Sequence, residues 1–225
     1  MKRIGLIVAV EIEALKKKYG NPTETINIRS RTILKYKANA YELYALLSGA
    51  GEIAAAAATQ LLISEFNVEI ILNFGVVGGL SEEISRHRVC VVRDIVHYDF
   101  DTSSVDNCEI GRHLEYASVF IPTDKALRDH AQKISPDLVP VTCASGNKFV
   151  VDPEEKNSIH QQFQADIIEM EAAGILLTCN QNVVPCLMIK MVADGITGGA
   201  EEFSKEFTRS SEMCLEVLDV IVSEL

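Results

Sequence analysis

The chain has 225 residues, of which 48% are hydrophobic and 24% are charged. This length and composition predict one domain over residues 1–225, with enough apolar side chains for a sizeable core. The net charge of −11 disfavours nucleic acid as a partner, because an acidic surface repels phosphate backbones. No apolar run reaches the roughly 20 residues that span a bilayer, so no membrane association is expected.

The N-terminus has a basic start and a short apolar run from Ile4 to Val10. Glu11 follows at once and no small-residue cleavage site is present, so the run predicts a buried first strand and not a signal peptide. The six cysteines lie far apart without a CxxC pair, and the five histidines are scattered. These features predict reduced thiols in a cytoplasmic protein, without a metal site.

Along the chain, short β-branched runs alternate with segments of helical character. Strands are predicted at 3–10, 41–48, 68–75, 89–96 and 183–194, and helices at 51–66, 124–134, 170–181 and 206–225. The first of these helices is Ala-rich, and Asp124 is a suitable N-cap for the second. Nearly continuous apolar strands are typical of a sheet covered on both faces, so the alternation predicts an α/β domain with a mostly parallel or mixed sheet.

The strand exits are the places to search for a site, because ligands of open α/β sheets lie beyond the carboxyl ends of the strands. Glu11 and Glu13 follow the first strand, where they could serve a ligand or form an acidic first helical turn. The segment NFGVVGGL, residues 73–80, could bring backbone N–H groups to a ligand or form a plain tight turn. Asp194 could serve a ligand or cap a turn. Phe149 could stack on a planar ring or fill a strand's buried face.

A family resemblance joins these signals. It is carried, in chain order, by GLIVAVEIEA, SGAGEIAAAAAT, NFGVVGGL, SGNKFV, IIEMEAAG and VADG. In this pattern the chain resembles the 5'-methylthioadenosine/S-adenosylhomocysteine nucleosidases of the purine nucleoside phosphorylase superfamily, from Met1 to about Val222. The EMEA block is its most specific part.

The resemblance implies a fold, an assembly and a reaction. The implied fold is a three-layer α/β/α sandwich around a mixed, partly barrel-like central sheet, usually in a homodimer. The implied reaction is hydrolysis of the bond between adenine and a 5'-substituted ribose, in methionine salvage. The partners are then a purine nucleoside and water, and no metal or organic cofactor is expected.

The resemblance also implies roles for single residues. Cleaving an N-glycosidic bond builds negative charge on the purine and positive charge on the ribose, so it needs an acid for the purine and a base for water. By the family pattern, Asp194 is the general acid toward N7 of adenine, and Glu13 positions and activates the water. The implied substrate-binding residues are Glu171 on the ribose hydroxyls, Met170 against the sugar, Phe149 on the base, Val150 at the adenine edge, and Val76, Val77 and Lys190 elsewhere in the pocket.

Several positions depart from the family pattern. The family usually has Ser at Val76, Ser at Ala193 and Arg at Lys190. Each lost hydrogen-bonding group can weaken transition-state stabilisation by about 1–3 kcal/mol if nothing replaces it. The segment around Val105 and Asn107, which lines the 5' pocket in the family, lacks the expected aromatic residues. These departures are compatible with a slow or differently specific enzyme.

Three alternatives stay open beside the favoured nucleosidase. A purine nucleoside phosphorylase would use phosphate in place of water, and the carboxylates of Glu11 and Glu13 would repel phosphate. A futalosine-type nucleosidase would differ in the 5' group, which the sequence does not specify. A catalytically weak nucleoside-binding protein is disfavoured by the presence of both an acid and a base, because binding alone does not require both.

Overall fold

The structure is a computed structural model that describes residues 1–38, 40–84 and 88–225. The strands are β1 (Lys2–Val8), β2 (Glu24–Ile28), β3 (Arg31–Lys37), β4 (Tyr41–Leu47), β5 (Ile70–Gly79), β6 (Val89–His97), β7 (Ile121–Pro122), β8 (Val139–Ser145), β9 (Ile167–Glu169) and β10 (Cys186–Asp194). The helices are α1 (Ile12–Tyr19), α2 (Glu52–Phe66), α3 (Ser103–Asp106), α4 (Lys125–Ile134), α5 (Pro153–Phe163), α6 (Ala172–Gln181) and α7 (Ala200–Ser223).

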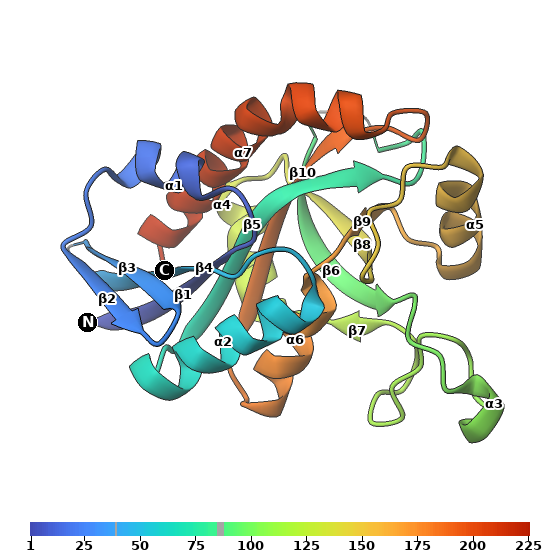
Figure 1. Cartoon of the computed structure of the whole chain (residues 1–225), viewed down its shortest axis with the longest axis horizontal. Helices are drawn as coiled ribbons and strands as arrows, with labels where there is room; N and C mark the ends of the chain where they lie inside the picture. Colours follow the sequence, from blue (N-terminus) through green and yellow to red (C-terminus); the bar gives the residue numbers. More distant parts are fainter. Residues whose placement is uncertain (39, 85–87) are drawn as a thin grey trace.

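The sheet is mixed and partly closed. Strands β5, β10, β6, β8 and β9 pair in that order, and β9 pairs back with β5, which closes a five-stranded barrel. From β5 the sheet continues outward through β1, β4, β3 and β2, on the left of Figure 1. This arrangement confirms the predicted mixed, partly barrel-like sheet.

Helices cover the sheet on two sides. In Figure 1, α2 and α6 lie below the sheet, whereas α1 and α7 lie above it. Ile71 of β5 belongs to the apolar cluster that contains Leu62 of α2, and its neighbour Leu72 belongs to the cluster that contains Leu15 of α1 and Leu218 of α7. Successive strand residues point to opposite faces, so a strand covered twice must be apolar throughout. All ten residues of β5 are accordingly buried.

Most of the predicted elements are present, and the exceptions have physical causes. The apolar runs became β1, β4, β5, β6 and β10, and the predicted N-cap is confirmed because Asp124 accepts a hydrogen bond from the Leu127 N–H at 2.8 Å. Strand β8 was not predicted as a strand, and it carries a proline at position 140, a residue usually confined to edges or strand starts. Helix α5 was missed because most of its residues are polar. Helix α7 begins six residues earlier than expected. The start was missed because the first turn is acidic and lies outside the apolar pattern from which the helix was predicted.

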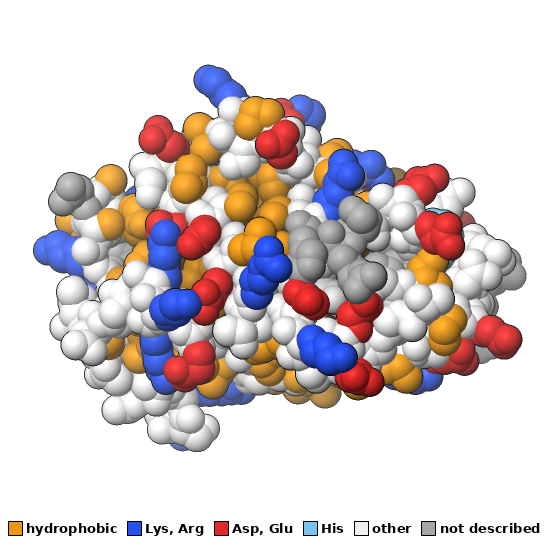
Figure 2. Space-filling model, turned by 90° about the horizontal axis from the view of Figure 1, so that it is seen from above, with side chains coloured by type: hydrophobic (Ala, Val, Ile, Leu, Met, Phe, Trp, Pro, Cys, Tyr) orange, Lys and Arg blue, Asp and Glu red, His pale blue; other side chains and the backbone are white. Residues whose placement is uncertain are grey.

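The surface carries both signs of charge. On the face shown in Figure 2, Lys and Arg side chains lie beside Asp and Glu side chains. The net negative charge is therefore not gathered into one patch on that face. Among the described residues, no helix combines the length and the apolar character needed to cross a membrane.

Candidate active site

The carboxyl ends of β1, β5, β9 and β10 meet at one edge of the sheet, where a cavity of about 220 Å³ opens beside a smaller one of about 20 Å³. The larger cavity is lined by residues that include Glu11, Val76, Val77, Phe149, Glu169, Met170, Glu171 and Phe203. Val150 and Asp194 line the smaller one. The structure thus brings seven of the predicted site residues to two adjoining cavities. The two cavities share five lining residues, Gly78, Phe149, Ile168, Glu169 and Met170.

Glu11, and not Glu13, is the first-strand acid that reaches the cavity. The buried Glu11 carboxylate accepts hydrogen bonds from the N–H groups of Val76 at 3.1 Å and Val10 at 3.0 Å. The Glu13 side chain is 82% exposed and pairs with Lys16 at 2.9 Å. Helix α1 begins at residue 12, and two positions along a helix differ by about 200°, so the two acids point apart. The structure therefore does not place Glu13 where the family pattern implied.

The glycine-rich loop makes room for this carboxylate. A Cβ atom added to Gly75 would lie 2.8 Å from Glu11 Oε1. The next residue, Val76, offers its backbone N–H to the same oxygen. The close approach of the Glu11 carboxylate to the β5 backbone thus requires a glycine at position 75, and the loop serves the site through its main chain.

Glu171 and Glu169 have different neighbours. Glu171 Oε1 accepts a hydrogen bond from the Gly51 N–H at 2.8 Å. Glu169 accepts hydrogen bonds from the N–H groups of Glu171 and Ala172 at 2.9–3.0 Å, and Lys190 Nζ lies 3.1 Å from its Oε2. Glu169 therefore caps the start of α6 and neutralises a buried ammonium, a role that the sequence did not assign. Lys190 reaches the site through this ion pair.

The carboxyl groups of Glu11 and Glu171 hold their protons more tightly than ordinary carboxyl groups, because the pKa of each is raised. Burial raises the pKa of Glu11, and the backbone N–H of Val10 and the charge of Lys190 oppose the rise. Burial, followed by the charge of Glu169, raises the pKa of Glu171 to about 7. Such shifts are typical of carboxyl groups that exchange protons with a substrate near neutral pH.

Asp194 ends β10 and is almost fully buried, with 2% exposure. Its Oδ2 atom accepts a hydrogen bond from Lys156 Nζ at 2.5 Å, whereas its Oδ1 atom has no hydrogen-bond partner among the described residues. Burial raises the pKa of Asp194, and the ammonium of Lys156 opposes that rise. The carboxyl group thus has one held oxygen and one unpartnered oxygen beside the smaller cavity.

An aromatic pair borders the larger cavity. Phe149 lies on the loop after β8 and is 44% exposed, so it is not the buried strand residue that was the alternative. Its ring meets that of Phe203 edge to face, with centroids 5.2 Å apart and an interplanar angle of 77°. The sequence did not reveal Phe203, because α7 was expected to begin only after it. Together the rings supply an apolar surface for a planar base or a thio group.

One group of possible metal ligands lies close to the cavity among the described residues. Glu52, His97 and Asp99 offer ligand atoms within 4.8 Å of one another. These atoms already contact one another, since His97 Nε2 lies 2.9 Å from Glu52 Oε2 and 3.3 Å from Asp99 Oδ1. The Asn147 side chain also donates to Glu52 at 2.9 Å. The group is a hydrogen-bonded network that ties the start of α2 to the end of β6.

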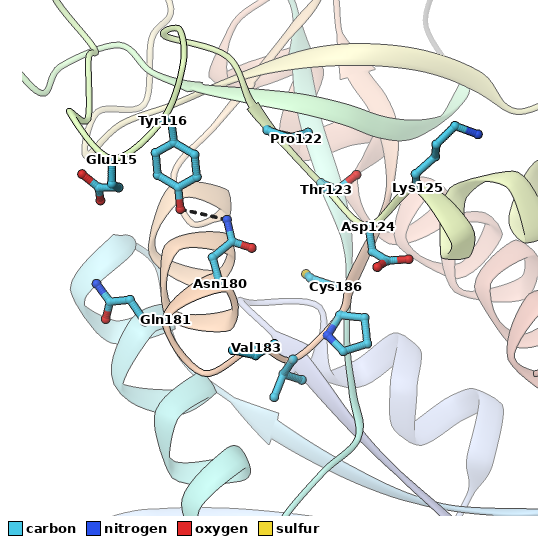
Figure 3. A pocket seen from close by; sticks show the side chains of 12 residues that line it. Glu115, Tyr116, Pro122, Thr123, Asp124, Lys125, Asn180, Gln181, Val183 and Cys186 are labelled. Carbon is cyan, nitrogen blue, oxygen red and sulfur yellow. Dashed lines mark hydrogen bonds between the residues drawn. The ribbon is translucent and has the colours of Figure 1, made fainter.

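A larger hollow, of about 730 Å³, lies at the opposite end of β10 (Figure 3). Cys186, the first residue of β10, lines this hollow, whereas Asp194, the last, lines the candidate site. At its edge, the Asn180 side chain donates a hydrogen bond to the hydroxyl of Tyr116 at 2.9 Å. None of the described residues that line this hollow is a predicted site residue, so we assign the chemistry to the carboxyl ends.

Comparisons with known proteins identify the family of this chain. The family model described as the phosphorylase superfamily matches residues 3–225. The chain is 30% identical to the 5'-methylthioadenosine/S-adenosylhomocysteine nucleosidase of Staphylococcus haemolyticus (strain JCSC1435), over 96% of this chain and 98% of the relative. It is 27% identical to the aminodeoxyfutalosine nucleosidase of Helicobacter pylori (strain J99), with 100% of both chains covered.

Solved structures give the same result. A futalosine hydrolase mutant of Helicobacter pylori strain 26695 matches with a TM-score of 0.94 and 25% identity, over 100% of both chains. A Helicobacter pylori MTAN mutant with 5'-methylthioadenosine in the active site matches with a TM-score of 0.93 and 26% identity, again over 100% of both chains. This chain therefore belongs to the phosphorylase superfamily and, within it, is a nucleosidase, an enzyme that hydrolyses an N-glycosidic bond.

Proposed function

We propose that this nucleosidase hydrolyses 5'-methylthioadenosine, S-adenosylhomocysteine or a related 5'-substituted adenine nucleoside, and releases adenine. The observation that carries the proposal is the convergence of Glu11, Glu171 and Asp194 on adjoining cavities bordered by Phe149. The full-length similarity to a 5'-methylthioadenosine/S-adenosylhomocysteine nucleosidase supports a purine nucleoside as the substrate.

Asp194 is the proposed general acid. Its burial raises its pKa, which is the direction required of a group that must hold a proton near neutral pH. As the bond between C1' and N9 breaks, its electron pair moves onto the purine, and Asp194 gives its proton to N7. Protonation makes the purine a neutral leaving group.

Glu11 is the proposed base, in the role that the family pattern gave to Glu13. Two backbone N–H groups fix its carboxylate at the cavity. The carboxylate takes a proton from water as the water oxygen bonds to C1'. Its negative charge also stabilises the positive charge that develops on the ribose.

The remaining residues bind the two halves of the nucleoside. Glu171 is proposed to accept hydrogen bonds from the ribose hydroxyls, with Met170 against the sugar. Phe149 is proposed to stack on the adenine ring, and the backbone at Val150 to bind its edge. Val76, Val77 and Lys190 complete the pocket, Val76 through its backbone N–H and Lys190 through Glu169.

Water is the proposed nucleophile in place of phosphate. The larger cavity is lined by three carboxyl groups, those of Glu11, Glu169 and Glu171. Lys190 is a cation near them, and it is already paired with Glu169 at 3.1 Å. The described residues that line this cavity include no Lys or Arg, so they offer a phosphate ion no cationic partner, which disfavours its binding.

The 5' substituent is the open part of the specificity. Similarity over the full length to an aminodeoxyfutalosine nucleosidase supports a second candidate substrate of that type. Val105 of α3 is 85% exposed, which is in keeping with a segment that completes the 5' pocket of a neighbouring subunit in a homodimer. All six cysteines are free thiols, which supports a cytoplasmic location. A role in methionine salvage follows only from the proposed substrates.

The test is adenine release at catalytic amounts of enzyme, from methylthioadenosine, adenosylhomocysteine and an aminodeoxyfutalosine-type nucleoside. We expect adenine from at least one of them in phosphate-free buffer, with no increase on adding phosphate. A strict requirement for phosphate would replace hydrolysis by phosphorolysis. No release from any of the three, with binding retained, would make the chain a nucleoside-binding protein.

A further inference from the structure

Helix α5 carries a fully buried lysine into the candidate active site. The side chain of Lys156 has 0% exposure. Its Nζ donates hydrogen bonds to Asp194 Oδ2 at 2.5 Å and to the carbonyl oxygen of Gly195 at 2.8 Å. These two contacts join α5 to the end of β10 at the acid proposed to protonate the purine.

The helix directs this residue inward. Asp152 caps α5 by accepting a hydrogen bond from the Glu154 N–H at 3.1 Å. Lys156, Ile159 and Phe163 are the buried residues of α5, and their spacing of three and four residues places them on one face. Ile159 and Phe163 join a small apolar cluster, so a lysine on the same face requires an explanation. An apolar side chain of similar length would fill the space without the cost of desolvating an ammonium.

The other charged groups near Asp194 are acids, or lysines that are paired with acids. The charged groups on elements around Asp194 or its cavity are Lys156 of α5, Glu202 of α7, Glu169 of β9 and Lys148 of the loop before α5. Glu202 accepts a hydrogen bond from the Gly195 N–H at 2.9 Å and raises the pKa of Asp194. Lys148 is 60% exposed and pairs with Glu155 at 2.7 Å, and the ammonium of Lys190 is bound to Glu169. The only ammonium in this set that is hydrogen-bonded to Asp194 is that of Lys156.

Resting on the proposed function, we propose that Lys156 is the positioning residue of Asp194. It holds Oδ2, leaves Oδ1 to present the proton to the purine, and sets the upper pH limit of the reaction. The residue before this acid is Ala193, which has no hydroxyl that could orient the carboxyl group. The lysine contact supplies the orientation from another element.

The proton path gives this contact a chemical consequence. When Asp194 gives its Oδ1 proton to N7, the carboxyl group becomes a carboxylate. The water proton ends on Glu11, and exchange with solvent restores both acids. The ammonium of Lys156 stabilises the carboxylate as it forms, so it makes Asp194 a stronger acid. The ammonium also causes Asp194 to lose its proton at a lower pH than it would without Lys156.

The experiment is the pH dependence of kcat for adenine release, in the wild type and in Lys156→Met. Removing the ammonium should raise the pH at which Asp194 ionises, so the alkaline limb should move upward by about one pH unit or more. On the low-pH side of that limb, kcat should fall by about three- to tenfold, because the acid is weaker and less well oriented. Lys125→Met, which removes an exposed lysine of α4, should leave the limb in place.

A merely structural role for Lys156 would lower stability or the fraction of active enzyme equally at every pH. An alkaline limb that stays in place in a folded Lys156→Met enzyme overturns the proposal. Lys156→Gln, which keeps a donor and removes the charge, repeats the test if the methionine variant does not fold. If neither folds, infrared titration of the wild type against Asp194→Asn identifies the carboxylic acid band of Asp194. That band should fade over the interval of the alkaline limb, and its persistence above the limb overturns the proposal.

The two proposals fail in different ways. A wild type that releases no adenine from any nucleoside overturns the proposed function. An active wild type with no shift of the limb in Lys156→Met overturns only the role of Lys156.

Discussion

The substitution Glu11→Gln tests which of the two glutamates that follow the first strand, Glu11 or Glu13, acts as the base. In the structure, the carboxylate oxygens of Glu11 accept N–H groups from Val76 and Val10 at 3.1 and 3.0 Å. Glutamine has one carbonyl oxygen, so its amide group would face one of these donors. The unsatisfied donor should cost about 1–3 kcal/mol of unfolding free energy, which a domain of ordinary stability tolerates. Loss of the base should reduce kcat by about 10²–10⁴-fold, equivalent to roughly 3–5 kcal/mol of activation free energy.

The assay is the initial rate of adenine release in phosphate-free buffer, over nucleoside concentrations on both sides of KM. Glu13→Gln is the matched control, because it makes the same chemical change two residues away at an exposed position. We expect its rate to stay within about twofold of the wild type. Far-ultraviolet circular dichroism checks that both variants are folded. A folded Glu11→Gln with normal kcat, beside an inactive Glu13→Gln, would refute the assignment and restore the family pattern.

Four further predictions follow from the same site. Asp194→Asn keeps the shape of the side chain without an acidic proton, so adenine release should fall by about 10²–10⁴-fold, and near-normal activity would exclude the acid role. Glu169→Gln leaves the buried ammonium of Lys190 unpaired, so urea unfolding should show a loss of about 3–5 kcal/mol of unfolding free energy. Glu171→Gln should instead reduce activity far more than stability. Equal effects of the two substitutions on activity and on stability would contradict the separate roles. The pKa of Glu171 rises from 4.5 to about 7 on folding, so the folded protein binds the extra proton and Glu171 contributes stability that is full below pH 4.5 and is lost as pH rises through 7. Relative to Glu171→Gln, the wild type should therefore lose up to about 3 kcal/mol across that window, and a constant difference in unfolding free energy would refute the shift. Gly75→Ala places a Cβ atom 2.8 Å from Glu11 Oε1, so kcat should fall by at least about tenfold with a small change in melting temperature; an unchanged kcat would show that the carboxylate moves freely.

The sequence indicates where the site lies better than which atoms form it. Apolar runs identify β1, β5 and β10, and ligands gather at the carboxyl ends of such strands, so Asp194 and the glycine-rich loop could be located in advance. The choice between Glu11 and Glu13 could not be made from spacing. It depends on the residue at which α1 begins, and helix boundaries are the least certain part of a sequence pattern.

Helix α5 shows a second limit of the sequence. Only three of its residues are buried, and one of these is a lysine, so no apolar stripe reveals the helix. A lysine in a polar segment is usually a solvated surface residue. Its burial follows from the contact with Asp194, which lies 38 positions away in the chain and becomes a neighbour only after β10 has joined the sheet.

The EME segment shows how one change of secondary structure gives two glutamates different chemistry. Glu169 ends β9 and Glu171 precedes the first residue of α6, so the backbone turns between them. The carboxylate of Glu169 accepts a hydrogen bond from the Glu171 N–H at the start of α6 and another from Lys190. The carboxylate of Glu171 instead accepts one from the Gly51 N–H, in the loop before α2. Lys190, where the resemblance implied an arginine, therefore acts first on Glu169, through one ammonium contact and not a two-donor fork. Because the charge of Glu169 in turn raises the pKa of Glu171, the departure at position 190 reaches the proposed ribose-binding acid through its neighbour.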